Sequence, residues 1–141
     1  MGKTVIKNRE REIPKALKFV QNDLEKGDFS RDFAIFIDIT IDEVLSNIIH
    51  YAYTDKDAHE ITIETKSNKS TFTLTFEDDG IPFNPLSHVP ETQADIPLVH
   101  RKKGGLGIYL ITRIVDDIKY ERVDGKNILT LIKTEDKTSK L

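Results

Sequence analysis

The sequence has 141 residues, of which 38% are hydrophobic and 32% charged, and this composition predicts a soluble globular protein with a single domain over residues 1–141. The net charge of −3 lacks the basic surplus that nucleic-acid binding requires, so we expect no direct nucleic-acid partner. Cysteine is absent, which excludes disulfides and thiolate metal sites. No stretch reaches the roughly 20 apolar residues of a membrane span, so we expect no membrane insertion and a cytoplasmic location.

The first half of the chain combines one short β-favouring segment with two helical patterns and two alternating strands. The first helical pattern ends at Gly27, and the second, longer pattern follows Ser30, a residue type that caps helices. The two alternating segments predict a β-hairpin. We place these five elements at residues 3–7, 12–26, 31–53, 59–66 and 71–77.

The second half begins with residues 84–103, which contain three prolines and no periodicity, and we interpret them as a lid or binding loop. After them we expect a helix, two strands joined by an Asp-Gly hairpin turn at residues 124–127, and a short polar tail. We place these last elements at residues 106–117, 118–123, 128–133 and about 134–141. Strands joined by hairpins predict an α/β (α+β) two-layer sandwich, with a mostly antiparallel mixed sheet and helices on one face.

The helix predicted over residues 31–53 has an apolar face and a separate polar row. Glu43, Asn47 and His50 stand at positions i, i+4 and i+7, so their side chains follow one another along the same side of the helix. Such a row is more often a solvated surface than a site. Two motifs further along the chain favour the functional interpretation.

The first of these motifs is Glu77-Asp78-Asp79-Gly80-Ile81-Pro82-Phe83, at the end of a predicted strand. An acidic step before glycine is often only a turn, because Asp tolerates turn geometry and Gly supplies positive φ. The alternative is that one carboxylate accepts a hydrogen bond from an exocyclic amine such as adenine N6. Guanine presents an oxygen at that position and would be rejected.

The second motif is Lys102-Lys103-Gly104-Gly105-Leu106-Gly107-Ile108, in which glycines lead into a helix. Glycine lets the backbone approach a ligand closely, and free N–H groups at a helix start favour an anion. The motif is not a Walker A loop, and the chain lacks the signature motifs of ordinary protein kinases.

In this order, the three motifs resemble the boxes of the Bergerat-fold (GHKL) ATPases. The ending Ile48-Ile49-His50-Tyr51-Ala52-Tyr53, the Pro-Phe form of the second box and the small size look most like the stand-alone bacterial anti-sigma factor serine/threonine kinases of the RsbW and SpoIIAB type. The resemblance covers residues from about 4 to 133. Two features depart from it: Pro82 replaces a second glycine, and Lys126-Asn127 replaces the Gly-Thr of a third box.

The resemblance implies a role for each matching position. Glu43 would be the general base, and Asn47 the side-chain ligand of Mg²⁺. Asp78 would recognise the adenine of ATP, while Gly80 and the residues after it, including Phe83, would form the wall of the nucleotide pocket.

The glycine motif would bind the phosphates of ATP. Gly104, Gly105 and Gly107, with Leu106 between them, would provide backbone contacts, and Lys103 would stand near the terminal phosphate. Neighbouring basic residues could do the same, so the assignment of Lys103 stays open.

The resemblance implies a function in transcription regulation. The protein would be an ATP-dependent serine kinase that phosphorylates a STAS-type anti-sigma-factor antagonist and alternately sequesters a sigma factor, as a homodimer in the cytoplasm. Two alternatives stay open: a nucleotide-gated protein-binding module without kinase activity, and an ATP-hydrolysing switch. Glu43 favours catalysis, because a module that only binds nucleotide has no use for a base.

Overall fold

The computed structural model describes residues 2–88 and 105–135. Its elements follow the chain in an order close to the expected one. They are β1 (Gly2–Lys7), the 3-10 helix η1 (Glu10–Glu12), α1 (Ile13–Glu25), α2 (Arg31–Tyr51), β2 (Glu60–Asn68), β3 (Thr71–Asp78), the 3-10 helix η2 (Pro85–His88), α3 (Gly105–Ile114), β4 (Asp117–Val123) and β5 (Lys126–Thr134).

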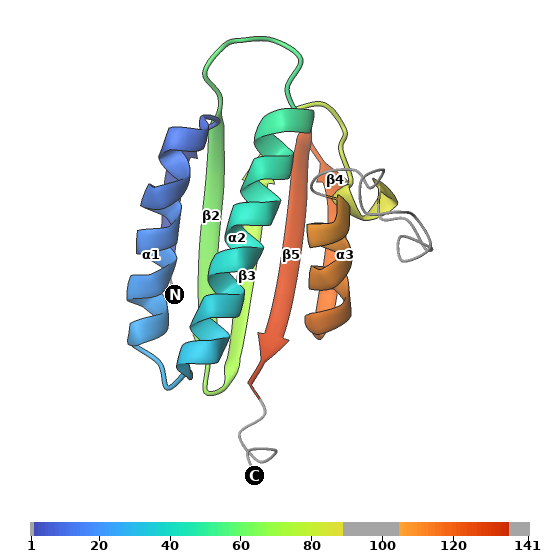
Figure 1. The fold of residues 1–141 in the computed structure, drawn as a ribbon. Coiled ribbons are helices and arrows are strands. Elements are labelled where there is room, and N and C mark those ends of the chain that lie inside the picture. The colour runs from blue at the N-terminus through green and yellow to red at the C-terminus, as the bar shows by residue number, and fades with distance from the viewer. Residues whose placement is uncertain (1, 89–104, 136–141) are drawn as a thin grey trace.

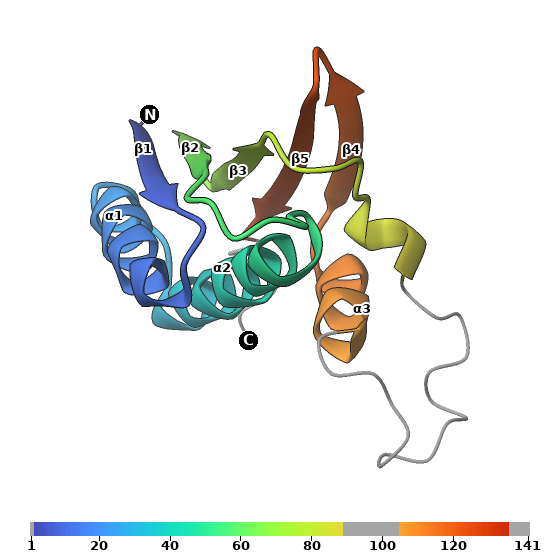
Figure 2. The ribbon, with the colours of Figure 1, turned by 90° about the horizontal axis from the view of Figure 1, so that it is seen from above.

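The described strands form one sheet in the order β1-β2-β3-β5-β4, and all their pairings are antiparallel. Figures 1 and 2 show α1, α2 and α3 side by side on one face of this sheet. This arrangement confirms the expected two-layer α+β architecture. No helix in the described residues is long and apolar enough to cross a membrane.

The core lies between the two layers and follows directly from strand alternation. Ile61 and Ile63 on β2, and Phe72, Leu74 and Phe76 on β3, are buried, while the residues between them face the other side of the sheet. The face of α2 that was predicted to be apolar supplies the facing layer. Ser30 caps α2 as expected, because its side chain accepts a hydrogen bond from Phe33 N at 3.1 Å.

Two boundaries near the C-terminal end differ from the expectation. The last helix ends at Ile114 and not at Asp117, because Asp116 N donates to Ile132 O (2.9 Å) and joins the chain to the sheet. The polar tail begins later than expected. Thr134 belongs to β5, and Glu135 accepts a hydrogen bond from Ser30 N at 2.9 Å.

The segment predicted to be a lid starts with an element that the sequence did not reveal. Asn84 Oδ1 accepts from Leu86 N at 2.9 Å and introduces the short helix η2. The rest of that prediction, at residues 89–104, lies outside the described residues, as do residues 136–141 of the tail.

The hairpin between β4 and β5 is tighter than predicted. Asp124 (φ 50°) and Gly125 (φ 76°) form a two-residue turn, which requires positive φ at both positions. Asn127 therefore belongs to strand β5 and not to the turn. It stands directly opposite Asp78 of β3 in the register of the sheet.

Candidate active site

The polar row of α2 lines a cavity of about 250 Å³ on the surface of the helical layer. Side chains of η1 and of three successive turns of α2 line this cavity. They are Glu10, Asp42, Glu43, Ser46, Asn47, His50 and Tyr51. The structure therefore brings the three residues of the predicted row together in one concave site.

Glu43 is positioned by α2 against the first turn of α3. A Cβ atom added to Gly107 would stand 2.7 Å from Glu43 Oε1 and would overlap the rest of the carboxyl group. The absence of a side chain at Gly107 therefore leaves room for the Glu43 carboxyl group in this position. Burial raises the pKa of the Glu43 carboxyl above its usual value, and the charge of Asp42 raises it further.

Asn47 lies one turn beyond Glu43 and is only 7% exposed. Its Nδ2 donates to the main-chain oxygen of Glu43 at 2.7 Å. This bond uses the donor end of the amide, so Oδ1 is the end left to accept a hydrogen bond or to bind a cation. The described residues contain no group of three or more His, Cys, Asp or Glu side chains that could hold a metal ion.

Asp78 lies at the end of β3 and is 4% exposed. Its Oδ1 accepts hydrogen bonds from Gly80 N and from Asn127 Nδ2, both at 2.9 Å. Burial raises the pKa of this carboxyl, and the two hydrogen bonds act in the opposite direction. Because both bonds end on Oδ1, the second oxygen is the one available to a ligand.

Gly80 connects this acidic turn to the end of α2. Ile81 N donates to Ala52 O at 2.7 Å, and a Cβ at Gly80 would stand 2.8 Å from the Ala52 side chain and would overlap the Ala52 main chain. Ala52 follows Glu43 by nine residues of helical rise, or roughly 13 Å. The helix α2 and its C-cap residue Ala52 therefore contact both the start of α3 and the Asp78 turn.

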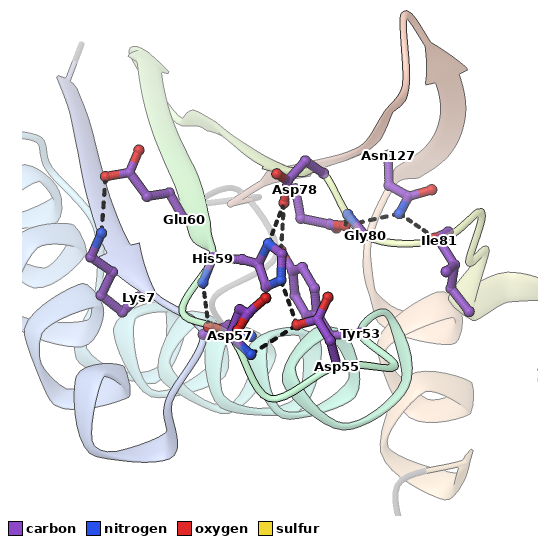
Figure 3. Close-up of polar contacts among 12 residues, drawn as sticks. Lys7, Tyr53, Asp55, Asp57, His59, Glu60, Asp78, Gly80, Ile81 and Asn127 are labelled. Atoms are coloured by element: carbon purple, nitrogen blue, oxygen red, sulfur yellow. Dashed lines mark hydrogen bonds and ion pairs between the residues drawn. The ribbon is translucent and has the colours of Figure 1, made fainter.

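Asn127 belongs to this site although the sequence analysis assigned it no role. Its Nδ2 donates to Asp78 Oδ1 and to Ile81 O (2.8 Å; Figure 3). Its Oδ1 accepts from Phe83 N at 3.2 Å. One signal in the sequence could have revealed it. By strand alternation, Asn127 lies on the same face of β5 as the apolar residue Leu129. A polar residue on this buried face indicates a special role.

Phe83 was expected to form the wall of the nucleotide pocket. It is half-buried, and its ring lies 5.8 Å from the ring of Tyr51 at the end of α2. Its main chain is fixed by Asn127. Phe83 therefore lies between the Asp78 turn and the cavity of α2.

The glycine motif is only partly described. Gly105 begins α3, as expected for glycines that lead into a helix, and Leu106 follows in the same first turn. Gly107 makes the contact with Glu43. Lys103 and Gly104 lie outside the described residues.

A second polar cluster adjoins the Asp78 turn (Figure 3). The ring of His59 stacks on Tyr53 with 4.5 Å between centroids. Its Nε2 lies 2.8 Å from Asp55 Oδ1, and its Nδ1 lies 3.5 Å from Asp79 Oδ1. The hydrogen bond to Asp55 raises the pKa of His59, and the same bond lowers the pKa of Asp55.

Residues 6–133 match the family described as histidine kinase-like ATPase domain. The chain belongs to this family. The matched residues include α2, the Asp78 turn and α3.

Individual relatives are identical to this chain at about a third of the aligned positions. The chain is 33% identical to the serine-protein kinase RsbW of Bacillus mycoides (strain KBAB4), 34% to that of Bacillus cereus (strain B4264) and 32% to that of Bacillus anthracis (strain CDC 684 / NRRL 3495). Each similarity extends over 94 residues, which are 64% of this chain. The similar region spans 58% of the length of each relative.

Proposed function

We propose that this chain is an ATP-dependent serine/threonine protein kinase that acts as an anti-sigma regulatory factor. It phosphorylates a STAS-type antagonist and, alternately, sequesters a sigma factor. The observation that carries the proposal is the contact between Glu43 and Gly107, which holds a carboxylate at the start of α3. A helix start attracts phosphate groups, so a base at this point lies beside the expected terminal phosphate.

The nucleotide is expected to bind along α2. Asp78 accepts a hydrogen bond from the adenine amine, and its burial makes a mismatched base costly. Gly80 and Phe83 border the base, and the glycines that open α3 receive the phosphates. The close approaches at Gly80 and Gly107 fix the spacing between these two ends of the site.

Asn47 is suited to be a ligand of Mg²⁺, because its amide nitrogen already donates to Glu43 O and its Oδ1 is left to bind a cation. Mg²⁺ retains several waters and needs few protein ligands, which suits a single amide oxygen beside phosphate oxygens. Bound there, the ion would neutralise phosphate charge during transfer.

Glu43 is the proposed general base. The oxygen of a substrate serine attacks the terminal phosphorus, the bond to the bridging oxygen of ADP breaks, and the serine proton passes to the Glu43 carboxylate. Burial of Glu43 raises its pKa, which makes the carboxylate a better proton acceptor. The cavity of about 250 Å³ beside Glu43 gives the serine a route to this group.

The relatives support the same reaction, because their name is serine-protein kinase RsbW. Location in the cytoplasm and assembly as a homodimer are part of the proposal, as is the single-domain organisation. The competing functions are a nucleotide-gated binding module and an ATP-hydrolysing switch.

The deciding experiment incubates the purified protein with Mg-ATP labelled at the γ-phosphate and with a STAS-domain protein encoded beside its gene. Label on a serine or threonine of that protein supports the kinase. Capture of the partner that depends on nucleotide, without transfer of label, supports the binding module. Release of labelled phosphate to water alone supports the hydrolysing switch.

A further inference from the structure

Asn127 is the centre of a hydrogen-bond network that joins the β4–β5 hairpin to the Asp78 turn. Only 3% of Asn127 is exposed. Its Oδ1 accepts from Phe83 N, from Arg122 Nη1 (3.1 Å) and from the Tyr120 hydroxyl. Three donors around this atom require an acceptor there, so this end of the amide is the oxygen.

The other end of the amide is equally committed. Nδ2 donates one hydrogen to Asp78 Oδ1 at 2.9 Å and the other to Ile81 O at 2.8 Å. A flipped amide would place an oxygen against the Asp78 carboxylate and a donor against Tyr120 and Arg122. Because each of those contacts would be repulsive, the network allows a single orientation.

We propose that Asn127 is a positioning residue of the nucleotide site: it holds the Asp78 carboxylate with Oδ1 occupied and Oδ2 free, and thereby sets the preference for adenine over guanine. This inference rests on the proposed binding of a nucleotide at Asp78. Asn127 has no donor left for a ligand, so it acts through Asp78 and not by contact with the base. Arg122 strengthens the arrangement, because the same Nη1 also donates to Gly80 O at 2.8 Å.

The network also affects the pKa of the Asp78 carboxyl group. The ionisable groups that face Asp78 are Tyr53 just after α2, Asp79 after β3 and Arg122 on β4. Burial and Asp79 raise the pKa of Asp78, whereas Asn127, Gly80 N and Arg122 lower it. Loss of the Asn127 donor therefore moves the pKa of Asp78 upward. A proton on Oδ2 of Asp78 would turn that oxygen from an acceptor into a donor, which would oppose the adenine amine.

The test compares binding of Mg-ATP and Mg-GTP by calorimetry, over a range of pH, in wild type and three variants. Asn127→Leu removes the donor at similar size and should weaken ATP binding roughly tenfold or more. It should also reduce the ATP-to-GTP preference and move the acid limb of ATP binding to higher pH. Tyr120→Phe removes one donor to Asn127. It should change the ATP-to-GTP preference and the acid limb in the same directions, but by less.

Lys126→Ala is the matched control, because Lys126 is the neighbour of Asn127 on β5 and its side chain makes, within the described residues, an exposed ion pair with Glu77 at 3.5 Å. It should keep the wild-type preference and pH profile. A folded Asn127→Leu variant with the wild-type preference and acid limb overturns the inference. If that variant does not fold, Tyr120→Phe decides: a shifted acid limb supports the role of Asn127, and an unchanged one overturns it.

The same experiment separates this inference from the proposed function. If the wild type binds no ATP, both fail. If it binds ATP and the variants behave as expected but no phosphate reaches a protein substrate, the kinase proposal fails and the role of Asn127 stands.

Discussion

Gly107, in the first turn of α3, lies directly against the carboxyl group of Glu43 on α2. No side chain fits between them, since a Cβ at Gly107 would occupy the space of the carboxylate. Gly107 of the glycine motif and Glu43 of the polar row, 64 positions apart in the sequence, thus form one local structure. The proposed phosphate end of the site and the proposed base are therefore one unit.

This contact predicts the effect of Gly107→Ala. The added methyl group must push the flexible Glu43 side chain aside, so unfolding free energy should fall by no more than about 1–2 kcal/mol. Phosphate transfer should fall roughly 100-fold, because a small misplacement of a reacting group is costly. Thermal unfolding and transfer assays check the two expectations.

Leu110→Ala is the control for Gly107→Ala, because Leu110 lies on the same helix and is 51% exposed. It should leave transfer near the wild-type rate. Wild-type transfer in Gly107→Ala would show that the close contact is unimportant for the reaction.

Asp78→Asn tests recognition of the base. Gly80 N and Asn127 Nδ2 would still donate to the amide oxygen, so the amide nitrogen would replace the free carboxylate oxygen. A donor would then face the adenine amine, which should cost about 1–3 kcal/mol of ATP binding. GTP should lose less or gain, because its oxygen can accept from that donor. Equal losses for ATP and GTP in calorimetry would argue against base recognition by Asp78.

The pair of His59 and Asp55 predicts a pH-dependent contribution to stability. The folded pKa of His59 lies above its ordinary 6.5, so its contribution is complete below that pH and is lost as pH rises through the folded pKa. The folded pKa of Asp55 lies below its ordinary 3.8, so its contribution is present above that pH and is lost on further acidification. The pair therefore stabilises most between these two ordinary values.

A double-mutant cycle of His59→Gln and Asp55→Asn measures this coupling by urea unfolding. The coupling energy should be favourable at about pH 6 and much smaller at about pH 9, where His59 is neutral. The same coupling at both pH values would contradict the ionic pairing of His59 with Asp55.

Periodicity was sufficient for the architecture, because the apolar alternation of β2 and β3 and the apolar face of α2 are strong local patterns. The polar row of Glu43 and Asn47 was also readable, since helical spacing alone places their side chains on one side of α2. Predicting these features does not require information about contacts between distant segments of the chain.

The side chain of Asn127 is a polar one on the buried face of β5, but its proposed role could not be predicted in the same way. It depends on the register between β3 and β5, which places Asn127 opposite Asp78, and on a turn of two residues instead of four. His59 likewise gains its partners Asp55 and Asp79 through the path of the loop after α2. Long-range register and loop geometry are set by packing of the whole chain, which a local pattern does not contain.

Catalysis by Glu43, within a kinase that uses Asn47 for its metal, is the central claim. Glu43→Gln should bind Mg-ATP with nearly wild-type affinity and still capture its protein partners, because the base acts only when the serine loses its proton. Asn47→Ala should instead weaken Mg-dependent ATP binding as well as transfer. Asp42→Asn removes a charge that raises the pKa of Glu43, so it should lower transfer, but far less than Glu43→Gln does.

The most direct measurement is the single-turnover rate of phosphate transfer from saturating Mg-ATP to the STAS-type serine, in wild type and in Glu43→Gln. We expect a rate that is roughly 10²–10⁴-fold lower in the variant, with ATP affinity almost unchanged. Transfer by Glu43→Gln at the wild-type rate would contradict this expectation.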